Sequence, residues 1–423
     1  LLFNENVQFK KKANNKRFNK RIVQLTEQHI IKSNEWKEWC VKAKELYNQT
    51  LYYWRQSMFK NIQYFTEYEI LGLFREYSEP TFKALPSHCG QEIIKNLFKN
   101  VKSWQKARKE YEKNPNKFLG RPKMPKYKKE LSILGFNNCQ VKLKNGYIHF
   151  PKIIGISPMK TNIPNIDCCR VIPKSNHFVV EFVYTIEDVP QKEYNGKALG
   201  IDLGMNNIAS CVSTTSNGFI INGKPLKSVN QHYNKQKSKL QSYLPKGKFT
   251  TKRIEKLTLN RNNKIKNHLH HASKYIIEQA KNQDITKIVI GKNDQWKTNI
   301  NIGCKNNQNF VSLPHTQLVN LIEYKGKRAG IEVVKTEESY TSKCSALDLE
   351  PICKHEEYVG RRTKRGLFRT KSGLKINADQ NGATNILRKV IGNDFLVGFN
   401  KRAVIAPVKM QCFEQKLAHK QRF

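Results

Sequence analysis

Apolar and aromatic residues recur at spacings of three and four along residues 32–116, which is the pattern of amphipathic helices. One series starts at Trp39 and a second at Ile93, and Pro80 and Pro86 lie between them. Because proline interrupts a helix, the pattern predicts several helices rather than one. Their polar faces carry many lysines and arginines. Solvent exposure explains any single one of these, but the whole set favours contacts with phosphates.

Residues 117–195 change to short runs in which apolar and polar residues alternate, the pattern of half-buried strands. The stretch 120–128 contains two prolines, which exclude a helix and indicate an extended basic ribbon. We expect a small β-barrel built from residues 1–31 and 117–195, with the helical residues 32–116 inserted into it. The alternating runs lie at 21–25, 140–143, 147–150 and 178–184.

From residue 196 onward, apolar runs of strand length alternate with stretches of helical period. This alternation predicts a mixed sheet flanked by helices, so the whole chain is expected to be a multidomain α/β protein. We expect this domain to comprise residues 196–341 and 375–410, with an insert at 342–374 and a basic tail at 411–423. The expected strands are 198–202, 219–221, 287–290 and 331–334. A basic helical stretch is expected from about 230 to 280, and helices are expected over 313–329 and 378–390.

The charge of the chain indicates the class of its binding partner. Its 423 residues contain 76 lysines and arginines against 34 aspartates and glutamates, a formal net charge of +42. Repulsion of this size opposes a compact fold unless a polyanion neutralises it, so nucleic acid is the expected partner. The excess argues against an enzyme of small metabolites and against a secreted disulfide scaffold. Hydrophobic residues make up 38% of the chain, which is enough for folded cores.

Cysteine usage and apolar content indicate the compartment. The ten cysteines are scattered, and the neighbours Cys168 and Cys169 are too close to bridge comfortably, so we expect reduced thiols. No apolar run approaches the roughly 18 residues of a membrane helix, and the first residues do not have the pattern of a signal peptide. We therefore expect a cytoplasmic protein with neither a membrane partner nor a small-molecule substrate.

Three acidic residues stand out in so basic a chain because each lies at the end of an expected element. Asp202 ends the strand 198–202, Glu338 follows the strand 331–334, and Asp379 lies at the start of the last helix. An ordinary alternative for Asp202 is a turn residue at a strand end, and for Asp379 a helix N-cap. Taken together, their order predicts a magnesium site. Magnesium prefers oxygen ligands, and phosphodiester cleavage uses two ions about 4 Å apart.

Two segments carry a resemblance to a known family. Gly200-Ile201-Asp202-Leu203-Gly204-Met205-Asn206-Asn207 resembles the first motif of a RuvC-type nuclease, and residues 377–385 (Asn-Ala-Asp-Gln-Asn-Gly-Ala-Thr-Asn) resemble its third. With the basic ribbon 120–128 upstream, the chain from about residue 21 to residue 410 resembles TnpB, the OrfB protein of bacterial insertion sequences. Small type V CRISPR effectors descend from the same family.

The resemblance implies an RNA-guided DNA endonuclease of transposon origin. It implies an RNase H-like RuvC nuclease, a wedge barrel and a helical recognition domain, in a bacterial protein that acts at the nucleoid. The partners would be a structured guide RNA, encoded beside the gene, and double-stranded target DNA. Protein contacts would read a short motif beside the target while guide pairing reads the rest. The cofactors would be two Mg²⁺ ions, held by Asp202, Glu338 and Asp379, which are also the implied catalytic residues.

The first departure from the family concerns the second carboxylate. Many members place a glutamate directly after a strand like 287–290, where this chain has Gly291. A subset places it later, two residues before an aromatic–Thr–Ser element, and Glu338 fits that position. Its neighbour Glu337 is the alternative, since adjacent strand residues point to opposite faces and only one of the two can serve. Asp294 is a weaker candidate.

The second departure is in the insert 342–374. Family members usually carry a zinc ribbon there, with two Cys-x-x-Cys pairs. This chain has Cys344 and Cys353 with His355 nearby, but Thr370 and Ser372 stand where the second pair would lie. We therefore expect no bound zinc and a ribbon held by packing alone.

Further candidates follow from the charge pattern. His268 and His271 share a helix face, where packing or a phosphate-adjacent role is favoured over metal ligation, and Trp296 suits core packing as well as base stacking. The insert's basic run suits a nucleic-acid strand entering the nuclease. The candidate nucleic-acid contacts are Arg121, Lys123, Lys126, Lys128, Arg261, Lys264, Arg361, Arg362 and Arg365.

Competing functions remain open at this point. A nuclease-dead RNA-guided DNA-binding repressor would lose RuvC carboxylates, and this chain keeps Asp202 and Asp379, but Gly291 keeps that alternative open. A compact type V CRISPR effector would use the same chemistry. A DDE-type transposase is weaker because the motif order resembles RuvC. A generic basic RNA-binding protein would need no acidic motifs.

Overall fold

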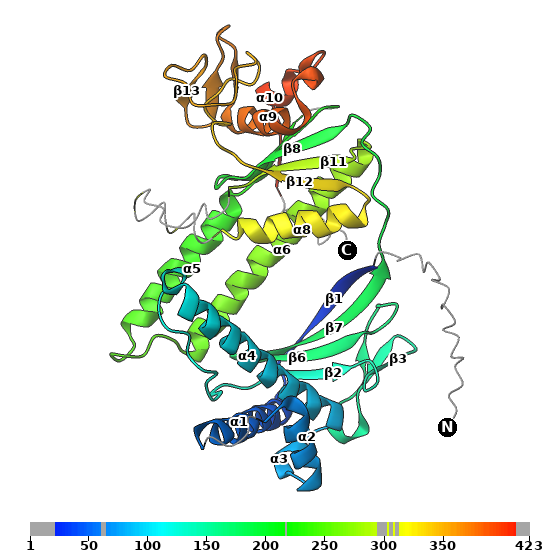
Figure 1. Ribbon diagram of the computed structural model, residues 1–423. Coiled ribbons are helices and arrows are strands. Elements are labelled where there is room, and N and C mark those ends of the chain that lie inside the picture. The colour runs from blue at the N-terminus through cyan, green and yellow to red at the C-terminus, as the bar shows by residue number, and fades with distance from the viewer. Residues whose placement is uncertain are drawn as a thin grey trace, which may run out of the picture. The chain divides into compact units, whose positions relative to one another are not determined.

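The structure is a computed structural model that describes residues 22–60, 65–215, 218–293, 303, 308 and 313–411. The chain divides into two compact units, Leu1–Asp188 and Val189–Phe423, which Figure 1 colours by residue number. Within the described ranges, no helix is both long and apolar enough to cross a membrane. Arg21, Asp294, Trp296 and the tail from 412 onward lie outside the described residues.

The first unit combines helices with two antiparallel sheets. A four-stranded sheet has the order β1-β7-β6-β2, and a three-stranded sheet has the order β3-β4-β5. Its strands are β1 Ile22–Ile31, β2 Leu134–Asn137, β3 Lys142–Lys144, β4 Tyr147–His149, β5 Met159–Lys160, β6 Cys168–Lys174 and β7 His177–Glu187. Its helices are α1 Lys37–Phe59, α2 Glu67–Glu76, α3 Pro80–Lys83, α4 Ser87–Lys113, η1 Pro115–Lys117 and η2 Lys152–Ile154.

The helices of this unit lie between β1 and β2 in the sequence, and both strands belong to one sheet. Each helix buries the apolar face that its periodicity indicates, including Leu46 and Leu97, in one core with the sheet. The expected closed barrel is not confirmed, because β1 and β2 are the outer strands of the four-stranded sheet. The stretch 121–129 is neither helix nor strand, as its prolines predict.

The second unit contains a six-stranded mixed sheet of order β12-β11-β8-β9-β10-β16. The strands β8, β9 and β10 form an antiparallel meander, whereas β11 and β12 run parallel to β8. A mixed sheet with helices is therefore confirmed, and the finer domain boundaries stay predictions. The strands are β8 Ala198–Asp202, β9 Asn207–Ser213, β10 Phe219–Asn222, β11 Lys287–Gly291, β12 Glu332–Thr336 and β16 Val408–Met410.

Helices cover both faces of this sheet, with α9 on one side and α6 and α8 on the other (Figure 1). Alternate residues explain the two cores, since Leu199 and Ile201 of β8 pack with α6 and α8, while Ala198 packs with α9. The expected helical stretch 230–280 consists of two helices, and Pro245 lies in the loop that separates them. The helices are α5 Lys224–Ser242, α6 Lys252–Asn282, α8 His315–Arg328, α9 Ala378–Ile391, α10 Arg402–Ile405 and η3 Asp394–Leu396.

The insert contains a small three-stranded antiparallel sheet, which the sequence pattern did not predict. Its strands are β13 Arg361–Lys364, β14 Leu367–Arg369 and β15 Lys375–Asn377, in the order β13-β14-β15. The last strand leads directly into α9, so the insert and the helix that carries Asp379 are continuous.

Candidate active site

Three segments bring Asp202, Glu338 and Asp379 to one edge of the six-stranded sheet. Asp202 is the last residue of β8, and Glu338 follows the end of β12 by two residues. Because β8, β11 and β12 are parallel, their carboxyl ends lie at the same edge. Asp379 is in the first turn of α9, which packs on β8. The N-cap of α9 is Asn377, whose side chain accepts from two backbone N–H groups, so Asp379 is not the cap.

The electrostatics of Asp202 indicate that the three carboxylates are neighbours. Burial raises the pKa of Asp202 well above its ordinary value, and the negative charges of Glu338 and Asp379 raise it further. Two smaller effects lower this pKa: the positive charge of Arg362 and a hydrogen bond from the backbone N–H of Leu203. Carboxylates that oppose one another's ionisation in a buried place need a cation to stabilise them all in the charged form.

Glu338 occupies the space that a side chain at position 291 would use. Gly291 ends β11 on the same face as Val289, which packs against α9. A Cβ atom built on Gly291 would lie 2.7 Å from Cγ and 2.9 Å from Oε1 of Glu338. A larger residue at 291 therefore excludes Glu338 from its observed place, and glycine is required there for this close approach.

The two adjacent glutamates are in different surroundings. Glu338 is half-buried, and desolvation raises the pKa of its carboxyl to about 7. The positive charge of Lys389 lowers this pKa, but by less. Its backbone N–H donates to Oδ1 of Asn293 at 2.8 Å. Its Oε1 atom is buried, and no described residue offers it a hydrogen bond. Glu337 is exposed and accepts a hydrogen bond from the hydroxyl of Ser339.

Asp379 is held by two side chains that the sequence did not assign to it. Asn207 donates through Nδ2 to Oδ2 of Asp379 at 2.7 Å. Arg362, from β13 of the insert, approaches Oδ1 at 3.2 Å through Nη2. A second insert arginine, Arg365, lies 3.1 Å and 3.2 Å from the side-chain oxygen of Asn206, with the amide of Asn206 oriented to accept. Of the predicted nucleic-acid contacts, Arg362 thus adjoins a carboxylate of the site, and Arg365 contacts Asn206.

The donor chemistry of these residues suits divalent cations, although among the described residues these three carboxylates do not form a group whose ligand atoms all lie within 4.8 Å of one another. The three side chains supply oxygen ligands, which magnesium prefers, and the Oε1 atom of Glu338 is a buried acceptor that a cation would satisfy. Gly382 of α9 leaves room beside Asp202, because a Cβ there would lie 2.9 Å from Oδ2 of Asp202.

The insert contains one cluster of metal-ligand types in the part of the chain that the structure describes. It consists of Cys344, Glu350 and His355, whose ligand atoms lie within 4.8 Å of one another. Of these, Glu350 was not among the residues that we expected from the sequence. Cys353 lies beside the cluster, with its Sγ 3.4 Å from Nε2 of His355.

A structural zinc ion takes four ligands, and in the structure the ligand atoms of Glu350 and His355 lie within hydrogen-bond distance of other groups. The Glu350 carboxylate already accepts from the backbone N–H groups of Ser345 at 2.6 Å and Val359 at 3.0 Å. Nε2 of His355 lies 2.8 Å from the carbonyl oxygen of Pro351, where an N–H donates. The residues Thr370 and Ser372, at the place of the second cysteine pair, bond to each other at 3.0 Å. Hydrogen bonds thus link the residues at the place where the resemblance implied a second cysteine pair.

The remaining predicted nucleic-acid contacts divide by exposure. Lys128 is half-buried, with Nζ 3.9 Å from the ring centroid of Tyr47 and 2.7 Å from Oγ of Ser132. Arg261 is half-buried and donates to Asn230 at 2.7 Å, so part of its role is to join α5 and α6. The exposed members are Arg121, Lys123, Lys126, Lys264, Arg361, Arg362 and Arg365.

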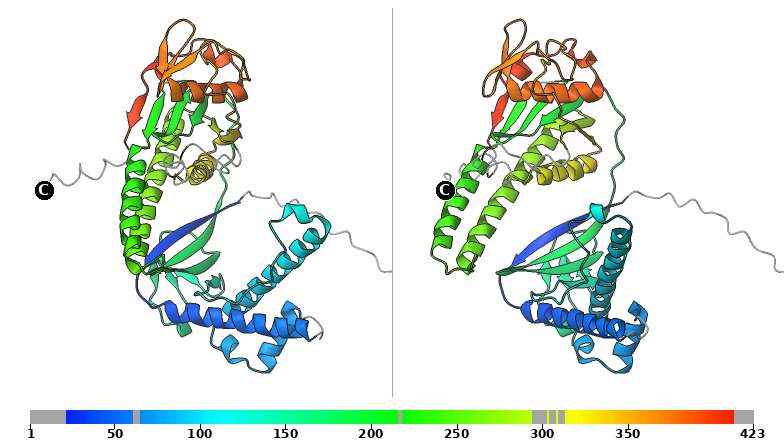
Figure 2. Two further views of the ribbon diagram at one scale, coloured as in Figure 1. Left: turned by 90° about the vertical axis from the view of Figure 1, so that its left-hand side faces the viewer. Right: turned by 60° about the vertical axis from the view of Figure 1, so that its left-hand side comes forward.

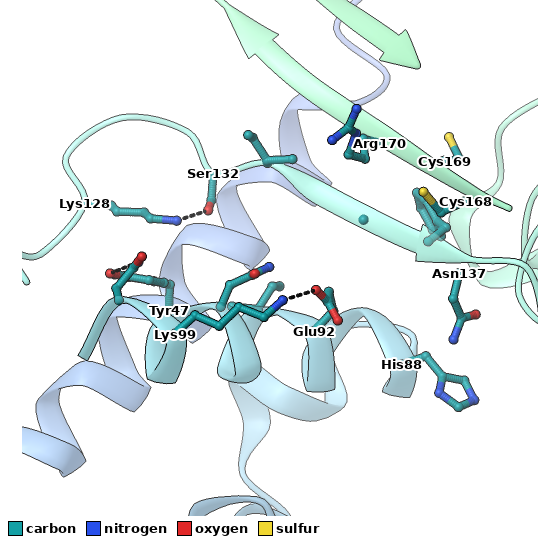
Figure 3. A pocket seen from close by; sticks show the side chains of 16 residues that line it. Tyr47, His88, Glu92, Lys99, Lys128, Ser132, Asn137, Cys168, Cys169 and Arg170 are labelled. Carbon is teal, nitrogen blue, oxygen red and sulfur yellow. Dashed lines mark hydrogen bonds and ion pairs between the residues drawn. The ribbon is translucent and has the colours of Figure 1, made fainter. Parts of the chain in front are cut away.

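A cavity of about 660 Å³ lies in the first unit between α1, α4, β2 and β6 (Figure 3). Lys99 and Glu92, both from α4, form an ion pair of 3.7 Å on its wall. Arg170 contributes from β6, and Asn137 from the end of β2. Cationic and amide side chains therefore line a space large enough for a nucleotide.

Comparisons with known proteins agree with the motifs. The family profile OrfB_IS605, described as "Probable transposase", matches residues 181–297, and the Cas12f1-like TNB domain matches residues 315–386. The TnpB-like protein ORF457 of Acidianus two-tailed virus is 26% identical over 283 residues, which are 62% of this chain and 55% of that protein. Over these residues the chain is similar to the TnpB family.

A further relative is the CRISPR-associated endodeoxyribonuclease Cas12f2 of a Micrarchaeota archaeon. It is 24% identical over 303 residues, which are 65% of this chain and 52% of that protein. The chain thus spans about half the length of the curated relatives it matches. The solved Cas12f1–sgRNA–target DNA complex matches with a TM-score of 0.49 at 16% identity, over 84% of this chain and 82% of that one.

Proposed function

We propose that this protein is an RNA-guided DNA endonuclease whose RuvC-type site consists of Asp202, Glu338 and Asp379. The observation that carries the proposal is the buried Oε1 atom of Glu338, which lacks a hydrogen-bond partner among the described residues and belongs to a cluster of three carboxylates. An unpaired buried acceptor is costly unless the site normally holds a cation. Two magnesium ions bound there would activate the attacking water and stabilise the leaving oxygen.

The residues of the chain have separate roles in this proposal. Asp202 and Asp379 hold metal from the sheet and from the helix, and Glu338 completes the set from the loop after β12. Asn207 fixes the orientation of the Asp379 carboxylate through its 2.7 Å hydrogen bond. Arg362 pairs with Asp379 in the metal-free protein, and its exposed guanidinium is available to a substrate phosphate once metal neutralises that carboxylate.

Nucleic-acid binding in this proposal follows from the charge of +42 and from the relatives. The printed names of these relatives describe an endodeoxyribonuclease and a complex with sgRNA and target DNA. We assign to this chain the same classes of partner, a guide RNA and double-stranded target DNA. The position of Glu338, where a side chain from residue 291 would lie, supports the nuclease over the nuclease-dead alternative.

We further propose that the cavity of the first unit contacts the bases of the motif beside the target. Asparagine amides such as Asn137 suit base edges, whereas Lys99 and Arg170 suit phosphates. Cleavage of a target library with randomised flanking bases tests this assignment. Asn137→Ala is expected to relax the preference at one flanking position, and an unchanged preference contradicts it.

The experiment that tests the function starts from protein purified with its native RNA. We expect a defined RNA with a guide segment, and magnesium-dependent cleavage of a plasmid that matches it. The Asp202→Ala variant is expected to bind the same RNA and target without cutting. Target binding without cleavage by the unaltered protein would support a guided repressor, and the absence of any defined RNA would contradict guided function altogether.

A further inference from the structure

The helices α5 and α6 form an antiparallel pair in the second unit, joined by the loop 243–251 (Figure 2). The side chains of Tyr243 and Phe249 in this loop are 70% and 76% exposed. Exposing two large rings to water within one short loop is unfavourable, because each forgoes the burial that aromatic side chains normally obtain. The rings therefore indicate a surface that is covered by a partner.

Contacts within the hairpin hold this loop in a defined shape. Nε2 of Gln241 donates to the carbonyl oxygen of Phe249 at 3.0 Å, which closes the loop across its two ends. The backbone N–H of Lys248 donates to the carbonyl oxygen of Pro245 at 3.0 Å. The side chain of Thr251 caps the first turn of α6. The two rings are thus presented by an ordered loop.

Further contacts join the two helices behind the loop. The hydroxyls of Tyr233 and Thr258 are 3.0 Å apart, and Nε of Arg261 donates to Asn230 at 2.7 Å. The guanidinium of Arg261 also lies 5.5 Å from the ring centroid of Tyr233. The hairpin is therefore a rigid support for its tip, which reduces the entropy lost when a partner binds there.

The charge around the rings identifies the chemistry of that partner. Residues 224–256 contain ten lysines and arginines and one acidic residue, Glu255. Lys246 and Lys248 lie between the two rings in the sequence, and both are exposed. Exposed rings interleaved with cations are the pattern that binds unpaired nucleic acid, with bases stacked on the rings and phosphates paired with the cations.

We propose that the tip of the α5–α6 hairpin is a binding surface for an unpaired stretch of RNA, with bases stacked on Tyr243 and Phe249. This inference rests on the proposed function only in taking RNA as the resident partner, which is bound before any target. A protein or membrane partner fits less well, because the rings are separated by lysines and do not form a continuous apolar face.

The test measures binding of a fluorescein-labelled 15-nucleotide oligouridine to the RNA-free full chain without magnesium. The double variant Tyr243→Ala/Phe249→Ala is expected to bind at least about fivefold more weakly, the lower end of what one stacked base contributes. Tyr77→Ala is the matched control: Tyr77 is 73% exposed but lies between Glu76 and Glu79, and its removal is expected to leave affinity unchanged.

Two further variants separate stacking from other causes. Tyr243→Leu/Phe249→Leu keeps an apolar surface without the rings, so stacking predicts a weakening like that of the alanine pair. Lys246→Gln/Lys248→Gln is expected to reduce the slope of log affinity against log salt by up to about 1.4, about 0.7 for each phosphate that is no longer neutralised, whereas the aromatic variants leave the slope unchanged.

Several outcomes would overturn the proposal. Unchanged affinity in the alanine pair would show that the rings do not touch RNA. Full affinity in the leucine pair would indicate an apolar docking surface instead of stacking. A weakening confined to oligothymidine of the same length would assign the tip to DNA. Because the binding assay needs no cleavage and can be repeated with Asp202→Ala, its failure is distinguishable from failure of the nuclease proposal.

Discussion

The side chain of Glu338 occupies the place at the sheet edge that a side chain on Gly291 would need. Gly291 lies beside Asp202 across the parallel pair β11–β8, whose last matched residues are Ile290 and Ile201. A glutamate at 291 would therefore adjoin Asp202 directly. This chain reaches the same place from the loop after β12, with Cγ of Glu338 at 2.7 Å from the Cβ position of residue 291.

This relationship predicts the effect of Gly291→Ala. The new methyl group would lie 2.4 Å from Cδ1 of Ile386 and would displace Glu338, so cleavage is expected to fall while RNA and target binding stay intact. Overpacking of this kind costs about 1–3 kcal/mol of unfolding free energy, which thermal unfolding measures. Gly72→Ala is the control, since nothing lies within 4 Å of a Cβ there. Undiminished cleavage by Gly291→Ala would show that the position of Glu338 does not matter.

A second prediction concerns Lys389 of α9. Its Nζ donates to the carbonyl oxygens of Glu337 at 3.0 Å and Ser339 at 2.8 Å, the residues on either side of Glu338. Lys389→Met is expected to raise the magnesium concentration for half-maximal cleavage by about 10–100-fold, the usual effect of removing support for a metal ligand. Lys389→Arg, which keeps the positive charge and the hydrogen-bond donors, is expected to bring the required magnesium concentration part of the way back. Equal magnesium dependence in all three proteins would contradict this role.

The insert is expected to be stable without metal. Purified protein should contain clearly less than one equivalent of zinc, and EDTA should leave the melting temperature unchanged. Glu350→Gln removes one acceptor for buried backbone N–H groups and is expected to cost about 1–3 kcal/mol. A full equivalent of zinc, released only on unfolding, would show that the cluster of Cys344, Glu350 and His355 is a metal site after all.

Acid destabilisation is expected from His268, whose side chain is 1% exposed in α6. Burial lowers the pKa of His268 from 6.5 to about 4. The folded protein therefore binds this proton less readily than the unfolded chain does, so the associated stability is present above pH 6.5 and is lost as the pH falls toward 4. The decrease is about 3 kcal/mol at most.

Urea unfolding at a series of pH values measures this effect. His268→Gln is expected to flatten the dependence between pH 6.5 and pH 4, whereas His232→Gln, at an exposed position of α5, is expected to leave it unchanged. The same dependence in His268→Gln as in the unaltered protein would assign the acid sensitivity to other groups.

The sequence predicted much of the second unit because its signals are local. The apolar runs around Val289 and Val333 were recognisable as strands. Asp202 and Asp379 were recognisable from the motifs that contain them. The helical period on either side of Pro245 indicated a helical stretch, but it did not locate the loop that divides this stretch into α5 and α6. Whether the strands of the first unit close into a barrel was not predictable. The alternation of apolar and polar residues identifies strands, but it does not show which strands pair with each other.

The less predictable part of the site depends on contacts between distant residues. Beyond the end of β12, alternation no longer fixes which way a side chain points, so Glu337 and Glu338 could not be separated from the sequence. Lys389 is about 50 residues from the loop that it holds, and its spacing gives no signal. Glu350 was missed because a buried carboxylate that binds backbone N–H groups has no sequence pattern of its own.

The most direct test of the account is cleavage by Glu338→Gln and Glu337→Gln, each loaded with the same RNA and checked for equal target binding. Because the proposal makes Glu338 a direct metal ligand, its replacement should slow cleavage by more than about 100-fold, the upper end of the effect of supporting residues. Glu337→Gln should cut at the rate of the unaltered protein. Retained cleavage by Glu338→Gln, with none by Glu337→Gln, would contradict the proposed site.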